Sequence, residues 1–155
     1  MTTKSEQLQD VVSDYREAGN KWPASMREVA TWAIHAGRWA PQPSAIINQC
    51  AEELARALRD EWVTDAQGRH IRTKHAATYT NGKEQYVLWD DIRTASPSHM
   101  QRAFQQRRHQ IFGDCKQLKT DVDSFNENRL PDTPIQIIFD FSADLVEAEL
   151  ARRAA

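Results

Sequence analysis

The sequence has no long hydrophobic run, since none of its apolar stretches approaches the roughly 18 residues that a membrane-spanning helix requires. Its first ten residues, MTTKSEQLQD, are polar and lack the apolar segment of a secretory signal peptide. These two absences predict a cytoplasmic protein that does not enter a membrane.

Cysteine is also scarce, with only two among 155 residues. Cys50 and Cys115 lie far apart and each falls in a helical pattern, which favours free thiols in a reducing compartment over a disulfide framework. Neither has a second cysteine or a histidine at metal-ligand spacing. We therefore expect no metal site at either cysteine.

Signatures of catalysis are missing as well. No serine lies in a nucleophile-elbow pattern, no glycine-rich phosphate loop is present, and the five histidines are scattered. The one acidic cluster, Asp114, Asp121 and Asp123, lacks the glycine and closing glutamate of an EF-hand. Solvated helix acids explain it better than a divalent-ion site for a nuclease, which stays a remote alternative. We expect no enzyme and no cofactor.

What the sequence does contain is typical of a globular protein, with 40% apolar and 27% charged residues. All five tryptophans lie in the first 90 residues, which predicts that the main core is there. The net charge of −2 is unevenly distributed, because residues 62–119 sum to +5 and residues 120–155 to −5. This layout suggests one surface for a polyanion and another for a different partner. Two ordinary solvated faces would explain it equally well.

Three helices are predicted in the first 60 residues. The first covers 5–18, and the second covers 25–36 with a capping box formed by Ser25 and Glu28. The prolines in RWAPQP interrupt the helical pattern. Ser44 is then the expected N-cap of an amphipathic helix over 44–60, with an apolar stripe that includes Ile47 and Leu54.

A change of period from 3.6 to 2 follows this helix. The turn DAQG and the turn Asn81-Gly82 separate short alternating runs, which predicts strands and hairpins up to Trp89. In the run RHIRTKHA, Ile71, Thr73 and His75 share one face of the expected strand.

The last third predicts a long helix, a strand and a final helix. The long helix begins at Ser96-Pro97 and extends to about Asn126, with Phe104, Ile111, Leu118 and Phe125 recurring every seven residues. PIQIIFDF (134–141) alternates as a strand does, and Ser142 is the expected cap of the last helix. A lone strand is unstable in water, so this one must pair with the hairpin region or with another chain.

Taken in order, residues 25–89 give a helix (SMREVATWA), a proline-broken turn, an amphipathic helix (PSAIINQCAEELARAL) and a hairpin with a basic loop (DAQGRHIR). This order resembles the winged helix-turn-helix superfamily, which binds DNA and also occurs in protein-interaction modules. The resemblance implies an α+β, mostly helical fold. It departs from the common pattern by having two separate turns, so either turn could be the tip of the wing.

The resemblance makes 44–60 the recognition helix, whose first residues would lie against base edges in the major groove. Amide side chains can pair with adenine, and cations on the following hairpin can neutralise phosphates. The site residues it implies are Gln42, Ser44, Asn48, Gln49, Arg69, His70, Arg72, Lys74 and Lys83. The competing interpretation is an ordinary core helix, acidic in its later turns, followed by a charge-protected edge strand.

The sequence therefore predicts a non-enzymatic DNA-binding protein, a small transcriptional regulator or accessory factor. A protein–protein adaptor on a winged-helix scaffold is the alternative. We expect a winged-helix core with its N-terminal helix over 1–90 and a C-terminal extension over 91–155. A homodimer through residues 97–141 would cover the heptad seam and present two recognition helices to a palindromic site. A monomer whose extension folds back over the core is the rival.

Overall fold

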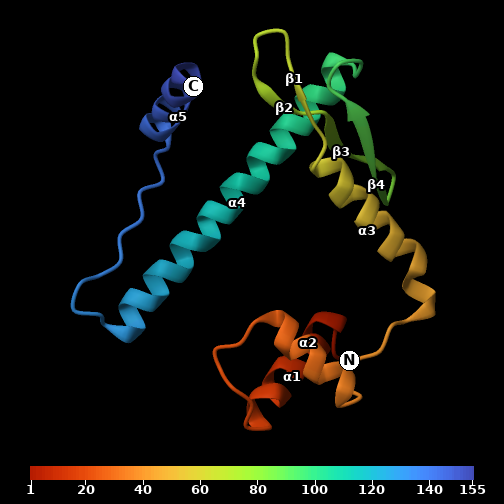
Figure 1. The fold of residues 1–155 in the computed structure, drawn as a ribbon, viewed down its shortest axis with the longest axis vertical. Helices are drawn as coiled ribbons and strands as arrows, with labels where there is room; N and C mark the ends of the chain where they lie inside the picture. The colour runs from red at the N-terminus through yellow and green to blue at the C-terminus, as the bar shows by residue number, and fades with distance from the viewer. The chain divides into compact units, whose positions relative to one another are not determined.

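The computed structural model describes all residues, 1–155, as two compact units, Met1–Ala55 and Arg56–Ala155. Figure 1 shows the order of the helices and strands along the chain. Helix α3, which spans Ile46–Arg59, begins in the first unit and ends in the second. We describe each unit by itself.

Helices α1 (Lys4–Glu17) and α2 (Met26–His35) pack on each other in the first unit. The predicted capping box is confirmed, because Ser25 Oγ accepts from the Glu28 N–H while the Glu28 carboxylate accepts from the Ser25 N–H. Gly37 follows α2 with a positive φ of 69°, a conformation that glycine adopts without strain.

The core of the first unit is small. Tyr15, Val29 and Ala33 are its buried residues, and the Tyr15 ring packs edge-on against Trp32 at 5.6 Å between ring centroids. None of the five tryptophans is buried. The tryptophans that pointed to a core in the first 90 residues therefore do not form it themselves, since Trp22, Trp39 and Trp62 are all exposed.

Helix α3 begins differently from the prediction. A short 3-10 turn, η1 (Pro43–Ala45), precedes it, and the residue that caps this turn is Gln42, without a side-chain hydrogen bond. Ser44 lies inside the turn, so its predicted role as N-cap is wrong. Pro43 explains the shift, because its fixed φ suits the first position of a helical turn. No residue of α3 is buried, and Ile47 and Leu54 are 83% and 61% exposed.

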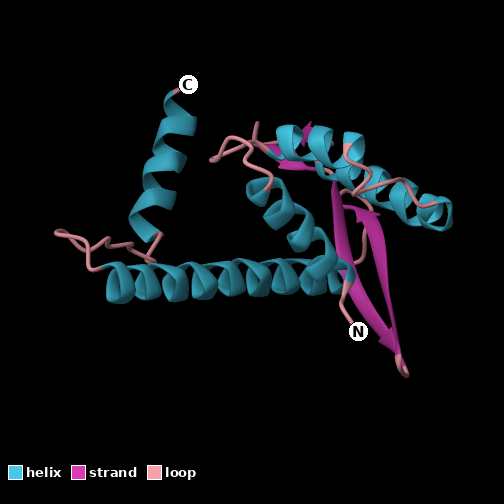
Figure 2. Ribbon diagram, turned by 90° about the horizontal axis from the view of Figure 1, so that it is seen from below, coloured by secondary structure: helices cyan, strands magenta, loops and turns pink.

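Two antiparallel hairpins form the strands of the second unit. Strands β1 (Trp62–Thr64) and β2 (His70–Arg72) pair with Val63 opposite Ile71, and β3 (Lys74–Asn81) and β4 (Glu84–Asp91) pair with Ala77 opposite Leu88. Figure 2 shows β3 and β4 as the longer hairpin. The predicted Asn81-Gly82 turn joins them, with Gly82 at a φ of 64°.

The long helix α4 (Pro97–Arg129) packs on β3 through its first turns. Ser96 caps it by accepting the His99 N–H, and the helix continues without a break through Gly113. Met100 and Ala103 are buried in this contact together with Ala77 of β3. The Gln106 side chain holds both the N–H and the C=O of Thr78, at 2.7 and 2.9 Å. The prediction of one long helix is confirmed.

The chain turns at Leu130, whose φ of 46° is left-handed, and returns along α4 as an extended segment, residues 131–141. The predicted strand over 134–141 is wrong, because the segment pairs with no other strand. Asn126 holds its backbone instead: the amide donates to the Ile135 C=O at 2.8 Å and accepts the Ile135 N–H at 3.0 Å.

Helix α5 (Ser142–Ala154) ends the chain. Its N-cap is Phe141, which makes no side-chain capping bond, so the prediction that Ser142 caps this helix is wrong. The backbone N–H of Ser142 donates to Asp140 Oδ1 at 3.0 Å instead. The protein is thus an α+β chain of mainly helical content with two small antiparallel sheets.

Candidate nucleic-acid interface

The predicted base-contacting residues surround the start of α3 in the first unit. All four, Gln42, Ser44, Asn48 and Gln49, are exposed. Gln42, Asn48 and Gln49, the first-turn amides, line one groove of about 550 Å³. α1 supplies the other side of the groove, including the cationic side chain of Lys4. The structure therefore brings three predicted residues together with an α1 cation that sequence reasoning missed.

The groove also carries charges that oppose a nucleic acid. Glu52 lines it, and the Gln49 amide donates to Glu53 at 3.2 Å. Arg38 is a second cation in its lining, but its guanidinium is bonded to Asp14. The free cation of the groove is Lys4, which forms no ion pair within the chain.

The loop between β1 and β2 is organised by Asp65 in the second unit. Its carboxylate accepts from the backbone N–H groups of Gln67 and Arg69, at 3.0 and 2.8 Å, and from the Arg69 guanidinium at 2.8 Å. The Arg69 N–H bond is the main cause that lowers the pKa of Asp65 below its ordinary value. Gly68 completes the turn with a φ of 81°. The tip of the β1–β2 hairpin is therefore ordered by Asp65, which also fixes the Arg69 side chain.

Two further predicted residues of this hairpin contact an aromatic ring. His70 stacks on Trp62 with 4.9 Å between ring centroids, and the Arg72 guanidinium lies 5.4 Å from the centroid of the same ring. Arg72 Nε is buried and makes no hydrogen bond. These contacts fix the orientation of both side chains on the β1–β2 hairpin.

Lys74 is neutralised by two carboxylates. Its ammonium lies 3.4 Å from Glu61 and 3.3 Å from Asp91, and the hydrogen bond to Asp91 raises its pKa. Asp91 also accepts from the Arg93 guanidinium at 2.7 Å. That bond, with the Arg93 N–H and the Lys74 ammonium, holds the pKa of Asp91 far below its ordinary value.

Lys83, beside the Asn81-Gly82 turn, is the one predicted cation without an aromatic or ionic partner in the chain. The balance of charge around it is even, because residues 61–93 contain five Lys or Arg and five Asp or Glu. The positive excess of the middle region lies on α4, whose first half contains Arg102, Arg107 and Arg108 and no acid.

A hydrogen-bond network that the sequence did not reveal joins α4 to β3. His99 and His75 are buried, and His99 Nε2 donates to the His75 C=O at 3.0 Å. The Tyr79 hydroxyl then donates to His99 Nδ1 at 2.9 Å, while His75 Nε2 donates to the Arg72 C=O at 2.8 Å. Because its ring nitrogens bond to a backbone carbonyl and a tyrosine, His99 anchors the helix start. The alternating pattern of RHIRTKHA was the only sequence signal that His75 faces inward.

No family model, curated protein or solved structure matches this chain.

The protein contains no group of three or more His, Cys, Asp or Glu side chains placed to hold a metal ion. In the acidic cluster of α4, Asp121 accepts from Gln117 and Asp123 accepts from Lys119. Cys50 is exposed, Cys115 is half-buried, and they are not bonded to each other. No helix is both long and apolar enough to cross a bilayer.

Proposed function

We propose that this chain is a non-enzymatic DNA-binding protein of winged helix-turn-helix type, acting as a transcriptional regulator or accessory factor. The observation that carries the proposal is the solvent-facing group of Gln42, Asn48 and Gln49 at the start of α3, in one groove with Lys4. The β1–β2 hairpin, with its tip set by Asp65, follows α3 directly in the chain.

In this proposal each group makes the contact that its chemistry allows. The first-turn amides pair with adenine edges, and Ser44 with a base edge or a phosphate. Lys83 is free to neutralise a phosphate, whereas Arg69 must leave Asp65 to do so. That exchange costs little, since an exposed ion pair contributes roughly 0–1 kcal/mol. Arg72 and Lys74 orient the hairpin, and they contact the DNA backbone only at the edge of the interface.

The test is the anisotropy of labelled duplex DNA of mixed sequence, titrated with protein across a salt series. We expect binding that weakens steeply with salt, because each neutralised phosphate contributes about −0.9 to the slope of log K against log salt. Lys83→Glu should weaken binding and reduce that slope by about 1. Lys83 is preferred to Arg72 or Lys74 for this test because its replacement breaks no internal contact.

Lys21→Glu is the matched control, since it makes the same charge change on an exposed residue outside the proposed interface. It should leave the salt slope unchanged. Asn48→Ala should lower the affinity for a selected binding sequence and retain the slope. Absence of binding at low salt, or an equal loss in Lys83→Glu and Lys21→Glu, would refute the proposal.

A second candidate function is a protein–protein adaptor, which the exposed apolar surface of the first unit favours. Ile47 and Leu54 of α3 face solvent. An apolar groove of about 360 Å³ also lies open between α1 and α2, lined by residues such as Val12, Val29 and Ile34. Exposed apolar surface of this kind is typical of interaction sites. The adaptor predicts no change in DNA anisotropy at any salt concentration.

A further inference from the structure

Helix α4 presents a continuous apolar column to solvent after its first turns have packed on β3. Ile111, Leu118 and Phe125 recur every seven residues and remain 52%, 45% and 41% exposed. A spacing of seven residues keeps side chains on nearly the same side of an α-helix, so the column is one stripe. Such a stripe on a 33-residue helix resembles one column of a coiled-coil seam.

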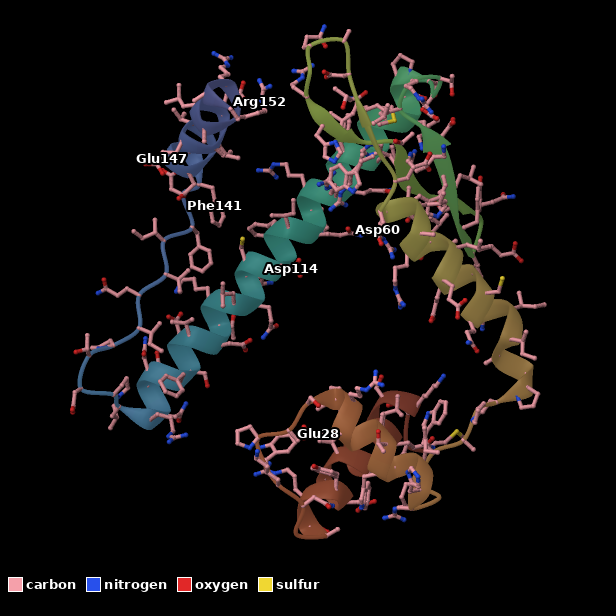
Figure 3. The ribbon with its side chains drawn as sticks, viewed as in Figure 1. Glu28, Asp60, Asp114, Phe141, Glu147 and Arg152 are labelled. Carbon is pink, nitrogen blue, oxygen red and sulfur yellow. The ribbon has the colours of Figure 1, made fainter.

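The returning segment widens this apolar surface. Phe139 and Phe141 lie beside Ile111, Phe112 and Cys115 of α4, around an apolar groove of about 650 Å³. Figure 3 labels Phe141 at the start of α5 and Asp114 at the middle of α4. The segment thus flanks the column on one side, and the column's other side is open.

The accessible area of the chain measures how much surface is uncovered. It is 13218 Å². Two separate compact units of 55 and 100 residues would together expose about 9,500 Å² by the usual scaling with mass. The excess of roughly 3,700 Å² exceeds the 1,000–2,500 Å² that each subunit of an obligate dimer buries. The excess is summed over both units, and the exposed column of α4 contributes to it.

Charges beside the column fix the direction of that partner. Arg107, Asp114 and Asp121 each follow a column residue by three positions, so they lie along the same edge of the stripe. Arg107 and Asp121 form no ion pair within the chain. In two parallel copies the edge that carries Arg107 and Asp121 would lie on opposite sides of the seam in the two helices, so Arg107 would not face Asp121. Two antiparallel copies centred near Asp114 place Arg107 of each opposite Asp121 of the other.

We infer that the occupant of this surface is a second copy of the same chain, packed antiparallel along α4 about a two-fold axis near Asp114. Phe104 then lies opposite Phe125 of the second copy, and Ile111 opposite Leu118. Because the contact is isologous, both the Arg107–Asp121 pair and each apolar pair occur twice. Asp114 faces its own copy across the axis and is the one like-charge contact.

The inference goes beyond the proposed function and does not depend on it, because α4 contains none of the residues proposed to contact DNA. Failure of DNA binding would leave the dimer intact, and a monomer could still bind DNA.

Sedimentation equilibrium of the full chain tests the inference. We expect a mass twice the chain mass of 17.8 kDa. Arg107→Glu and Asp121→Arg should each weaken association by about tenfold, because two symmetric attractions become repulsions. The double variant Arg107→Glu/Asp121→Arg should return to the wild-type dissociation constant. Equimolar mixing of the two single variants should give a heterodimer tighter than either homodimer.

Glu127→Lys is the matched control, because it changes a charge on the same helix away from the column and should leave association unchanged. Every variant alters an exposed side chain, and circular dichroism at 222 nm checks that its helix content is retained. A monomeric wild-type chain at tens of micromolar would overturn the inference, whether α5 or a different protein covers the column. Single charge variants without effect, or a double variant that stays weakened, would overturn the antiparallel arrangement.

Discussion

At the scale of single residues, Thr73 between β2 and β3 is the largest side chain that is fully buried. It is 2% exposed, its N–H donates to the Glu61 C=O, and its C=O accepts the Ile92 N–H. Its hydroxyl has no hydrogen-bond partner. A buried hydroxyl without a partner costs free energy, because it loses its hydrogen bonds to water on folding.

Thr73→Val should therefore stabilise the fold by about 1 kcal/mol, since valine has the same shape and no hydroxyl to desolvate. The measurement is thermal unfolding followed by circular dichroism. Thr73→Ser is the control, which keeps the hydroxyl, removes a methyl group and should destabilise. A destabilised Thr73→Val would show that the hydroxyl has a partner in solution.

A second prediction at this scale concerns Asp91 and acid. Its pKa lies below the ordinary 3.8 because Arg93 and Lys74 bond to the carboxylate, so the carboxylate stabilises the fold above that pH. The contribution is lost as pH falls from about 5 toward and below the folded-state value. Asp91→Asn should lower the Tm at pH 7 and make the Tm fall less than in wild type between pH 7 and pH 3.

Glu84→Gln serves as the comparison, because Glu84 forms no ion pair and its removal should leave the pH dependence of the Tm unchanged. Equal pH profiles for wild type and Asp91→Asn would mean that the Lys74–Asp91–Arg93 contacts do not persist in solution.

At the scale of secondary-structure elements, the interior of α4 contains one glycine, Gly113, which has a low helix propensity. Glycine in a helix interior costs about 0.5–1 kcal/mol relative to alanine because of its backbone freedom in the unfolded chain. A Cβ added at this position meets no atom within 4 Å. The helix therefore tolerates a larger residue here at no steric cost.

We expect Gly113→Ala to stabilise α4 by about 0.5–1 kcal/mol. The readout is the Tm together with helix content at 222 nm. Because Gly113 lies on the side of α4 opposite the apolar column, the sedimentation behaviour should not change. A weaker dimer in Gly113→Ala would mean that the dimer contact lies on the Gly113 side of α4, away from the apolar column.

Elements with purely local causes could be predicted from the sequence. The capping box at Ser25 and the Asn81-Gly82 turn each depend on residues within four positions, and both appear as expected. The strand over 134–141 could not be predicted in this way. Its alternation of Ile135, Ile137 and Phe139 specifies an apolar face, but a strand also needs a neighbour, and here the Asn126 side chain takes that place.

The candidate interface shows the same limit. The amides near Ser44 could be recognised as polar and exposed from the helical pattern alone. The neutralisation of Lys74 could not be predicted in this way. Its partners Glu61 and Asp91 lie 13 and 17 residues away in the sequence and come close to it only because the strands pair. Summed charge along the sequence therefore overstated the positive surface of the hairpins.

At the scale of the whole molecule, stability should depend on protein concentration. A folded dimer whose chains separate on unfolding gains about 2.7 kcal/mol per dimer from a hundredfold rise in concentration, because pairing stabilises the folded state by mass action. We expect the Tm to rise between low and high micromolar protein. Leu118→Lys, which puts a charge in the column, should remove this dependence and give one Tm at all concentrations.

The Asn126 side chain makes the hydrogen bonds that tie the returning segment to the end of α4. The Asn126 amide substitutes for the missing strand by offering the Ile135 backbone one donor and one acceptor, as a neighbouring peptide group would. Hydrolysis of that amide to a carboxylate, the spontaneous ageing reaction of asparagine, would leave a negative oxygen facing the Ile135 carbonyl. The hydrogen bond that Asn126 donates to Ile135 would then be lost, so the returning segment would be tied to α4 less firmly, mainly through Phe139 and Phe141.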